Sequence, residues 1–354
     1  MSLPANSSHS PPHPMTYHFL FVSDQIIGLL RKNGFFAISF GFNWSSSNHF
    51  LNTVSMALDK PVGRKQIITP PTVKLVAQRY NIPVAQPAKI RTWNIEPKIL
   101  KPDLLIVTAY GQIIPKNILD IPKFGCLNIH PSLLPKYRGA SPIQNTILNG
   151  DRKTGVTIIL MDERMDHGPI LAKRELEIPR LRQGFGGQAN PKITYQKLHD
   201  ELAKLGAELL IETIPNWIGG KIKPELQDGS KATYTKIIKK EDGKINWSKT
   251  AEEIERQIRA FNHWPGSFSE ISNFKSQTSK PKCKIIKIIK AEIGRLKSKN
   301  KPGKIFLLEN NELAVMTGQN CLILQKLQIE GRKPITAEEF IRGHKYIIGK
   351  IFDS

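Results

Sequence analysis

Three short runs of apolar residues constrain the fold more than any other feature of the sequence. Leu104–Thr108 (LLIVT) is typical of a parallel strand that is buried on both faces, and residues 127–130 and 156–161 are two further strand candidates. Residues 141–150 begin with Ser-Pro and end with Gly, which predicts a helix, and leucines repeat at helical spacing over 195–214. Strands that alternate with helices predict an α/β domain with a mainly parallel sheet.

The sequence changes character after about Gly229. Two capping boxes, Thr250-Ala-Glu-Glu253 and Thr336-Ala-Glu-Glu339, each predict the start of a helix. Short β-like runs separated by turns accompany these helices, and this pattern predicts a small antiparallel barrel. The four runs are residues 284–289, 304–308, 312–317 and 321–327.

The chain is strongly basic, with 52 Lys and Arg residues, 30 Asp and Glu residues and a formal net charge of +22. Residues 230–354 carry 25 basic and 13 acidic side chains, and between Lys275 and Lys304 eleven basic residues occur with a single acid, Glu292. A solvated, lysine-rich surface would explain any one of these lysines. For the cluster as a whole we favour binding to a phosphate backbone.

Composition and pattern exclude several classes of protein. With 354 residues, of which 40% are hydrophobic and 23% charged, the chain is expected to be globular rather than disordered, collagen-like or coiled-coil. Its three cysteines are an odd number without C-x-x-C spacing, which argues against a disulfide framework and against structural zinc. Residues 17–42, the most apolar early stretch, are interrupted by Asp24, Arg31 and Lys32 and are not expected to span a membrane.

Polar residues at the end of a predicted strand form the densest group of candidate catalytic side chains. Asn128 and His130 are two residues apart, so they project from one face of the strand while Ile129 packs behind. Open α/β sheets bind ligands at the carboxyl ends of their strands, and an amide beside an imidazole can stabilise an oxyanion and transfer a proton. The alternative is a strand-end histidine with a structural role only.

Three carboxylates follow the next predicted strand, in residues 162–169 (DERMDHGP). Asp162, Glu163 or Asp166 could reach His130 and fix its tautomer, or accept a proton from a nucleophile, and the sequence does not choose among them. A solvated turn is the alternative. The chain lacks a G-x-S-x-G elbow, an H-E-x-x-H helix and a G-x-x-x-x-G-K-[ST] loop, which leaves transfer of an acyl-type group by His, Asn and Asp.

Residues 180–189 (RLRQGFGGQA) are typical of an insertion in a surface loop. Their glycines fit the G-x-G-x-x-A form of the dinucleotide fingerprint, but residues 179–183 separate them from the preceding predicted strand. The tight strand-to-helix turn that this fingerprint requires is therefore missing.

The run from Asn128 to Gly139 (NIHPSLLPKYRG), followed by MDHG at 165–168, resembles the folate-dependent formyltransferases. Three further stretches agree with this family in order and spacing: DKPVGR at 59–64, AYG at 109–111 and GHKYIIG at 343–349. The resemblance covers residues 59–354 apart from 180–189. Within the family it is greatest to the members that formylate methionyl initiator tRNA.

The resemblance implies a role for individual residues. The catalytic trio would be Asn128, His130 and Asp166. Arg64 would lie in a loop that contacts the acceptor stem of the tRNA, and no metal is implied. The formyl donor, 10-formyltetrahydrofolate, would pack near Ser132, Leu133, Leu134, Pro135, Tyr110 and Gly111.

The resemblance also implies a division into domains. A flexible tail over 1–15 would precede a Rossmann-like formyltransferase domain over 16–228 and a basic, OB-like tRNA-binding barrel over 229–354. Residues 1–58 diverge from the opening strand and G-T-P-x-F-A loop of the family, although 17–22 can form a strand and 24–30 a helix. We expect a cytoplasmic monomer without membrane contact.

Three alternatives share some of these features. A formyltransferase for a small amine, such as glycinamide ribonucleotide or an amino sugar, would use the same trio without needing the basic C-terminal third. A formyltetrahydrofolate hydrolase would also share the trio but carry an N-terminal regulatory domain, which residues 1–58 do not resemble. An RNA-binding protein whose catalytic domain is crippled at its N-terminus would keep only the basic part.

Overall fold

A computed structural model of the chain describes residues 15–20, 36–37, 49–55, 59–62, 66–82, 84–86, 102–108, 113–179, 193–262, 264–276, 279–296 and 300–353. The chain divides into two compact units. The first comprises Met1–Pro135, Val156–Arg174 and Ala203–Lys231, and the second comprises Lys136–Gly155, Glu175–Leu202 and Ala232–Ser354. The predicted tail apart from Met15, the helix over 24–30 and the insertion over 180–189 lie outside the described residues.

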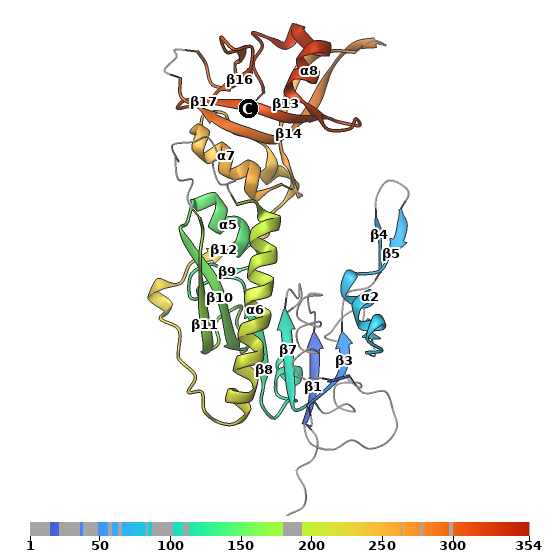
Figure 1. The fold of residues 1–354 in the computed structure, drawn as a ribbon, viewed down its shortest axis with the longest axis vertical. Coiled ribbons are helices and arrows are strands. Elements are labelled where there is room, and N and C mark those ends of the chain that lie inside the picture. Colours follow the sequence, from blue (N-terminus) through green and yellow to red (C-terminus); the bar gives the residue numbers. More distant parts are fainter. Residues whose placement is uncertain are drawn as a thin grey trace, which may run out of the picture. The chain divides into compact units, whose positions relative to one another are not determined.

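A mixed sheet of eight strands has the order β11-β10-β8-β7-β1-β3-β2, with β6 also paired to β3. Figure 1 labels its strands from β11 to β3. Neighbours among β2, β3, β1, β7 and β8 run parallel, whereas β10 runs antiparallel to β8. This arrangement fits the predicted Rossmann-like α/β domain, and each of the three apolar runs forms a strand. The strands are β1 (Met15–Leu20), β2 (Phe36–Ala37), β3 (His49–Ser55), β6 (Val84–Ala85), β7 (Leu104–Thr108), β8 (Cys126–His130), β10 (Lys153–Leu160) and β11 (Ile170–Glu177).

The long predicted helix is α6 (Tyr195–Ile218), which continues four residues beyond the predicted end and through Pro215. It comes close to β8 at Gly206, where a Cβ atom would lie 2.9 Å from Cγ2 of Ile129. Side chains at 206 larger than hydrogen would therefore push the helix away from the strand. This close approach buries Ile129 and leaves its neighbours in β8 to project from the opposite face.

The predicted helix over 141–150 is α5 (Pro142–Asn149). Gly150 ends it in the left-handed conformation, with φ of 67°, as predicted. Ser141 occupies the N-cap position but its side chain accepts no capping hydrogen bond, which corrects the predicted cap. Instead the backbone N–H of Ser141 donates to Oγ1 of Thr235 (3.0 Å), beside the parallel pair β9 (Arg138–Gly139) and β12 (Tyr234–Thr235).

The second unit contains an antiparallel sheet in the order β13-β14-β17-β16-β15, with β18 also paired to β17. Figure 1 labels β13, β14, β17 and β16. Its helices are α7 (Ala251–Ala260) and α8 (Ala337–His344), and both predicted capping boxes are present. A single core packs side chains from these elements, such as Phe340 of α8, against Trp247 and Phe352 from the segments outside them. The strands are β13 (Ser267–Ser276), β14 (Ser279–Gly294), β15 (Ile305–Leu307), β16 (Leu313–Met316), β17 (Cys321–Ile329) and β18 (Ile335–Thr336).

The predicted OB-like barrel is not confirmed, because the paired strands of the described residues form an open ladder from β13 to β15. The last residues of the chain nevertheless bond to both ends of this ladder. The N–H of Ile305, in β15, donates to the carbonyl of Lys350 (2.8 Å), and the N–H of Asp353 donates to the carbonyl of Glu270, in β13 (2.8 Å). The terminal segment thus links the two edge strands.

β13 was not predicted from the sequence. Its inward positions include Ser267 and Ser269, which are buried, so the strand lacks the apolar alternation that marks a half-buried strand. Ser269 is tolerated in the core because its hydroxyl accepts a hydrogen bond from Nε1 of Trp247 (2.9 Å).

Smaller elements complete the described chain. They are the hairpin β4 (Lys60–Val62) and β5 (Ile67–Thr69), the helices α2 (Thr72–Arg79) and α4 (Lys116–Leu119), and the 3₁₀ turns Gly229–Lys231, Lys240–Gly243 and Lys345–Ile347. Within the described residues, no helix is both long and apolar enough to cross a bilayer.

Candidate active site

The carboxyl end of β8 presents the two polar residues that the sequence pairs. Asn128 and His130 share one face of the strand, and Ile129 between them is buried on the other face, against α6. The imidazole of His130 is itself buried, with only 5% of its side chain exposed. This end of the sheet is where a parallel strand order places ligands.

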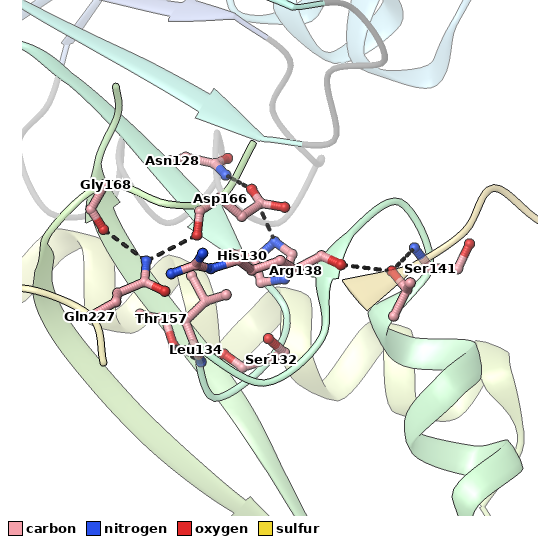
Figure 2. Close-up of polar contacts among 11 residues, drawn as sticks. Asn128, His130, Ser132, Leu134, Arg138, Ser141, Thr157, Asp166, Gly168 and Gln227 are labelled. Carbon is pink, nitrogen blue, oxygen red and sulfur yellow. Dashed lines mark hydrogen bonds and ion pairs between the residues drawn. The ribbon is translucent and has the colours of Figure 1, made fainter. Parts of the chain in front are cut away.

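Asp166 lies beside both of these side chains (Figure 2). The Asn128 amide donates to Oδ1 of Asp166 over 3.2 Å, and the same oxygen lies 3.5 Å from Nδ1 of His130. The Asp166 carboxylate is only 12% exposed. The three side chains therefore form one connected polar group, in which a carboxylate faces a ring nitrogen and an amide.

The two competing carboxylates are placed elsewhere. Asp162 bonds within its own loop: Oδ1 accepts from the N–H of Arg164 (2.9 Å) and Oδ2 lies 2.6 Å from Nδ1 of His167. Glu163 is exposed, with Oε1 4.0 Å from Nζ of Lys116. Of the three candidates, only Asp166 is brought to His130.

The backbone of the Asp166 loop is tightly constrained. Asp166 has a φ of 51°, in the left-handed region that few residues adopt apart from glycine, asparagine and aspartate. Two residues later, a Cβ atom on Gly168 would lie 1.9 Å from the carbonyl oxygen of Leu160, so the chain can pass there only with glycine. The Gln227 amide donates to the carbonyl oxygens of both Asp166 (2.9 Å) and Gly168 (2.8 Å) (Figure 2).

The loop that follows β8 contains four residues assigned to the formyl donor. Ser132 and Leu134 are buried, whereas Leu133 and Pro135 are half-buried. The Thr157 hydroxyl fixes the loop by donating to the Ser132 carbonyl (2.7 Å) and accepting from the N–H of Leu134 (3.1 Å). Nζ of Lys173 also donates to the Leu134 carbonyl (3.2 Å).

The arrangement favours polar stabilisation over nucleophilic catalysis. The one cysteine in β8, Cys126, is buried, and this burial raises the pKa of its thiol, so it is not a reactive thiolate. Among the described residues, the second N–H of the Asn128 amide has no hydrogen-bond partner and can donate to a developing oxyanion. Within those same residues, no three His, Cys, Asp or Glu side chains gather as a metal site would require.

Comparison with known proteins decides the family. Residues 45–213 match the family model for formyl transferase, and residues 237–345 match the model for the formyl transferase C-terminal domain. Methionyl-tRNA formyltransferase from Bacillus velezensis is 43% identical over 288 residues, which are 80% of this chain and 84% of that protein. The chain belongs to the methionyl-tRNA formyltransferase family. Its relative of that name from Geotalea uraniireducens is 39% identical over 295 residues, 83% of this chain and 87% of that protein.

Solved structures with this family's fold include proteins of low sequence identity. HypX from Aquifex aeolicus in complex with tetrahydrofolic acid has a TM-score of 0.57 and 17% identity, covering 93% of this chain and 47% of that chain. An N-formyltransferase from Helicobacter canadensis, in complex with folinic acid and dTDP-3-aminofucose, has a TM-score of 0.57 and 20% identity, covering 87% and 98%. At these identities the likeness shows a shared fold.

Three of the residues assigned through the family lie outside the described residues: Tyr110, Gly111 and Arg64. Two others that shape the site were not predicted. A polar side chain inside an apolar strand could have marked Thr157, but nothing in a single sequence marks Gln227, which lies 61 residues from Asp166.

Proposed function

We propose that the chain transfers the formyl group of 10-formyltetrahydrofolate to the α-amine of methionyl initiator tRNA. The observation that carries this proposal is the position of Asp166 within 3.5 Å of both the Asn128 amide and the His130 imidazole. An amide donor, an imidazole and a carboxylate are the groups that formyl transfer to an amine requires. The relatives at about 40% identity over most of the chain, which carry this activity in their names, favour the same acceptor.

The reaction assigns a task to each side chain. The α-amine attacks the formyl carbon, a C–N bond forms and the formyl oxygen gains negative charge. The free N–H of Asn128 and the protonated imidazole of His130 donate to this oxyanion. Asp166 holds the ring of His130, stabilises its positive charge and assists removal of the amine proton. The bond from carbon to N10 of the folate then breaks, and N10 takes up the proton.

The chemistry of the loop after β8 fits a folate donor. Leu133 and Pro135 offer half-buried apolar surface for a flat ring in the loop that directly follows His130, and Thr157 and Lys173 fix the backbone that would hold it. The bound folates named for HypX and for the Helicobacter canadensis protein agree with a donor of this class. Tyr110 and Gly111 would complete this side of the site.

The basic residues of the second unit would bind the tRNA. Lys290 and Lys326 are exposed cross-strand partners on β14 and β17, and neither has an acidic partner among the described side chains. Two like charges placed opposite one another destabilise a sheet unless a polyanion compensates them. The terminal segment that links β13 to β15 supports an OB-like barrel for this part, and Arg64 would contact the acceptor stem.

The proposal includes a boundary near 228, between the two family matches that end at 213 and begin at 237, and a cytoplasmic monomer. It is tested by supplying the full chain with 10-formyltetrahydrofolate and one of three acceptors: methionyl initiator tRNA, free methionine or an amino-sugar nucleotide. We expect formylated product with the tRNA only, and none with Asn128→Ala. Product with a small amine alone would identify the small-amine enzyme instead.

Two other results would also overturn the proposal. Hydrolysis of the donor without any formylated acceptor would indicate a hydrolase. Salt-sensitive tRNA binding without turnover would indicate an RNA-binding protein that has lost its chemistry. Binding measured in parallel at low and high salt distinguishes this last case from a preparation that is simply unfolded.

A further inference from the structure

The loop that carries Asp166 is held by a residue from a distant part of the chain. The carboxamide of Gln227 donates one hydrogen bond to the carbonyl oxygen of Asp166 (2.9 Å) and another to that of Gly168 (2.8 Å) (Figure 2). The amide therefore bonds to the backbone carbonyl oxygens of the two residues that flank His167.

The backbone around Gln227 is itself fixed to the sheet. Glu225 and Ile170, the first residue of β11, exchange two backbone hydrogen bonds of 2.9 and 2.7 Å. Leu226 points into solvent, with 83% of its surface exposed, while Gln227 on the next position turns toward the Asp166 loop. Successive side chains of this extended segment thus point alternately to solvent and to the Asp166 loop. Because its backbone is anchored at Glu225, the Gln227 amide has a defined position.

The Asp166 loop needs such an anchor because its conformation is unfavourable on its own. The left-handed region is unfavourable for residues with a Cβ atom, even though aspartate tolerates it better than most, and such backbone persists where the surroundings impose it. The φ of 51° at Asp166 is what directs its carboxylate to Asn128 and His130. Without the two bonds from Gln227, the loop would populate ordinary backbone conformations in which the carboxylate leaves this position.

We propose that Gln227 is a positioning residue for formyl transfer: its amide holds the Asp166 backbone so that the carboxylate stays against His130 and Asn128. The proposal rests on the proposed function. The two bonds from Gln227 to the loop end on backbone carbonyl oxygens, so their effect on the chemistry passes through the position of Asp166. It therefore acts on the chemical step rather than on tRNA binding.

Two substitutions remove the donors while keeping the size of the side chain. Gln227→Met replaces the amide by a thioether, and Gln227→Glu places a carboxylate against two carbonyl oxygens. Because a displacement of about 1 Å can lower a rate by about 10²-fold, we expect each variant to lower kcat by about 10- to 100-fold with little change in KM for the tRNA. Leu226→Ala, an exposed neighbour on the same segment, is the control and should keep the wild-type kcat.

A double substitution separates positioning from general destabilisation. In the Asp166→Ala background, Gln227→Met should lower the rate no further, because the carboxylate it positions is gone. Equal losses in both backgrounds would overturn the proposal, and so would a wild-type kcat in Gln227→Met and Gln227→Glu. A fall in thermal stability with unchanged kcat would mean that the bonds are structural only, and would also overturn it.

Hydrogen exchange tests the anchor without any assay of activity. The amides of residues 162–168 should exchange faster in Gln227→Met than in the wild type or in Leu226→Ala, while those of β8 keep their protection. Unchanged exchange in the loop would contradict the anchor. If the wild type formylated no acceptor at all, the proposed function would fail, but this exchange experiment would still decide whether Gln227 holds the loop.

Discussion

At the carboxyl end of β8, Asp166 lies within 3.5 Å of both Asn128 and His130, and these side chains are largely shielded from solvent. On the sheet of the second unit, by contrast, Lys290 and Lys326 are exposed and face each other across two strands. Under the proposed function the first group would work through a defined geometry that any one substitution would break. The second would work through summed charge, to which each lysine would add a small and replaceable part.

The comparison teaches where a substitution should matter. Loss of one member of a bonded catalytic group leaves the others misplaced, so the effects of single changes are large. Loss of one surface cation weakens attraction to a polyanion by a small factor and leaves the fold intact. The predictions that follow test this difference, beginning with the core of the second unit, on which the sheet that carries Lys290 and Lys326 depends.

The largest effect is expected from the core of the second unit. Trp247 is fully buried, its ring stacks on Phe352 with centroids 5.4 Å apart, and Nε1 donates to Ser269. Trp247→Ala should lower the free energy of unfolding by about 3–5 kcal/mol. The matched control is Trp264→Ala, since Trp264 is 56% exposed. Urea unfolding in which both variants lost the same stability would contradict the assignment of the core.

Among the carboxylates of one loop, a single substitution should abolish most of the chemistry. Asp166→Asn removes the charge beside His130 and should lower the single-turnover rate of formylation on the order of 10²–10³-fold. Glu163→Gln makes the same change of charge on an exposed side chain of that loop and should leave the rate unchanged. Similar rates in the two variants would show that the loop acts only through its total charge.

How much of this could be predicted from the sequence depends on whether the signal is local. The apolar runs of β7, β8 and β10 and both capping boxes are local patterns, and the predictions made from them hold. Side chains alternate between the two faces of a strand, and this alternation was enough to place Asn128 and His130 on one face. β13 was not predicted because serines occupy two of its buried positions, and Gln227 was not predicted because its contacts join residues far apart in the sequence.

An intermediate effect is expected at the start of α7. Thr250 accepts from the N–H of Glu253 (3.2 Å), and the carboxylate of Glu253 accepts from the N–H of Thr250 (2.9 Å). Thr250→Ala should cost about 1 kcal/mol of stability at pH 7. The hydrogen bonds from the backbone and side chain of Thr250 hold the pKa of Glu253 below its usual value.

The lowered pKa of Glu253 fixes the direction of the pH dependence. Its contribution is complete above the unfolded-state pKa of about 4.3 and is lost as the pH falls through the lower folded-state value. The difference in stability between wild type and Thr250→Ala should therefore shrink below about pH 4. Urea unfolding at neutral and acidic pH measures it, and a difference that grows on acidification would contradict the capping box.

The smallest effects are expected at the basic sheet. Lys290→Gln and Lys326→Gln should each weaken tRNA binding a few-fold and reduce the slope of log affinity against log salt by about 1. The rate at saturating tRNA should not change. Lys204→Gln, an exposed lysine on α6 that lies 4.0 Å from Glu208, serves as the control and should leave the salt slope unaltered. A lysine variant that bound tRNA normally but had a lower formylation rate at saturating tRNA would contradict the separation of binding from chemistry.

The most direct test of the account is single-turnover formylation of methionyl initiator tRNA by His130→Ala, measured against tRNA concentration beside the wild type. We predict a maximal rate lowered on the order of 10²–10³-fold, with an unchanged tRNA concentration at half-maximal rate. Formyl transfer would then depend on the side chains around Asp166, and tRNA binding on the lysines of the sheet in the second unit. A maximal rate near that of the wild type would contradict the assignment of the active site.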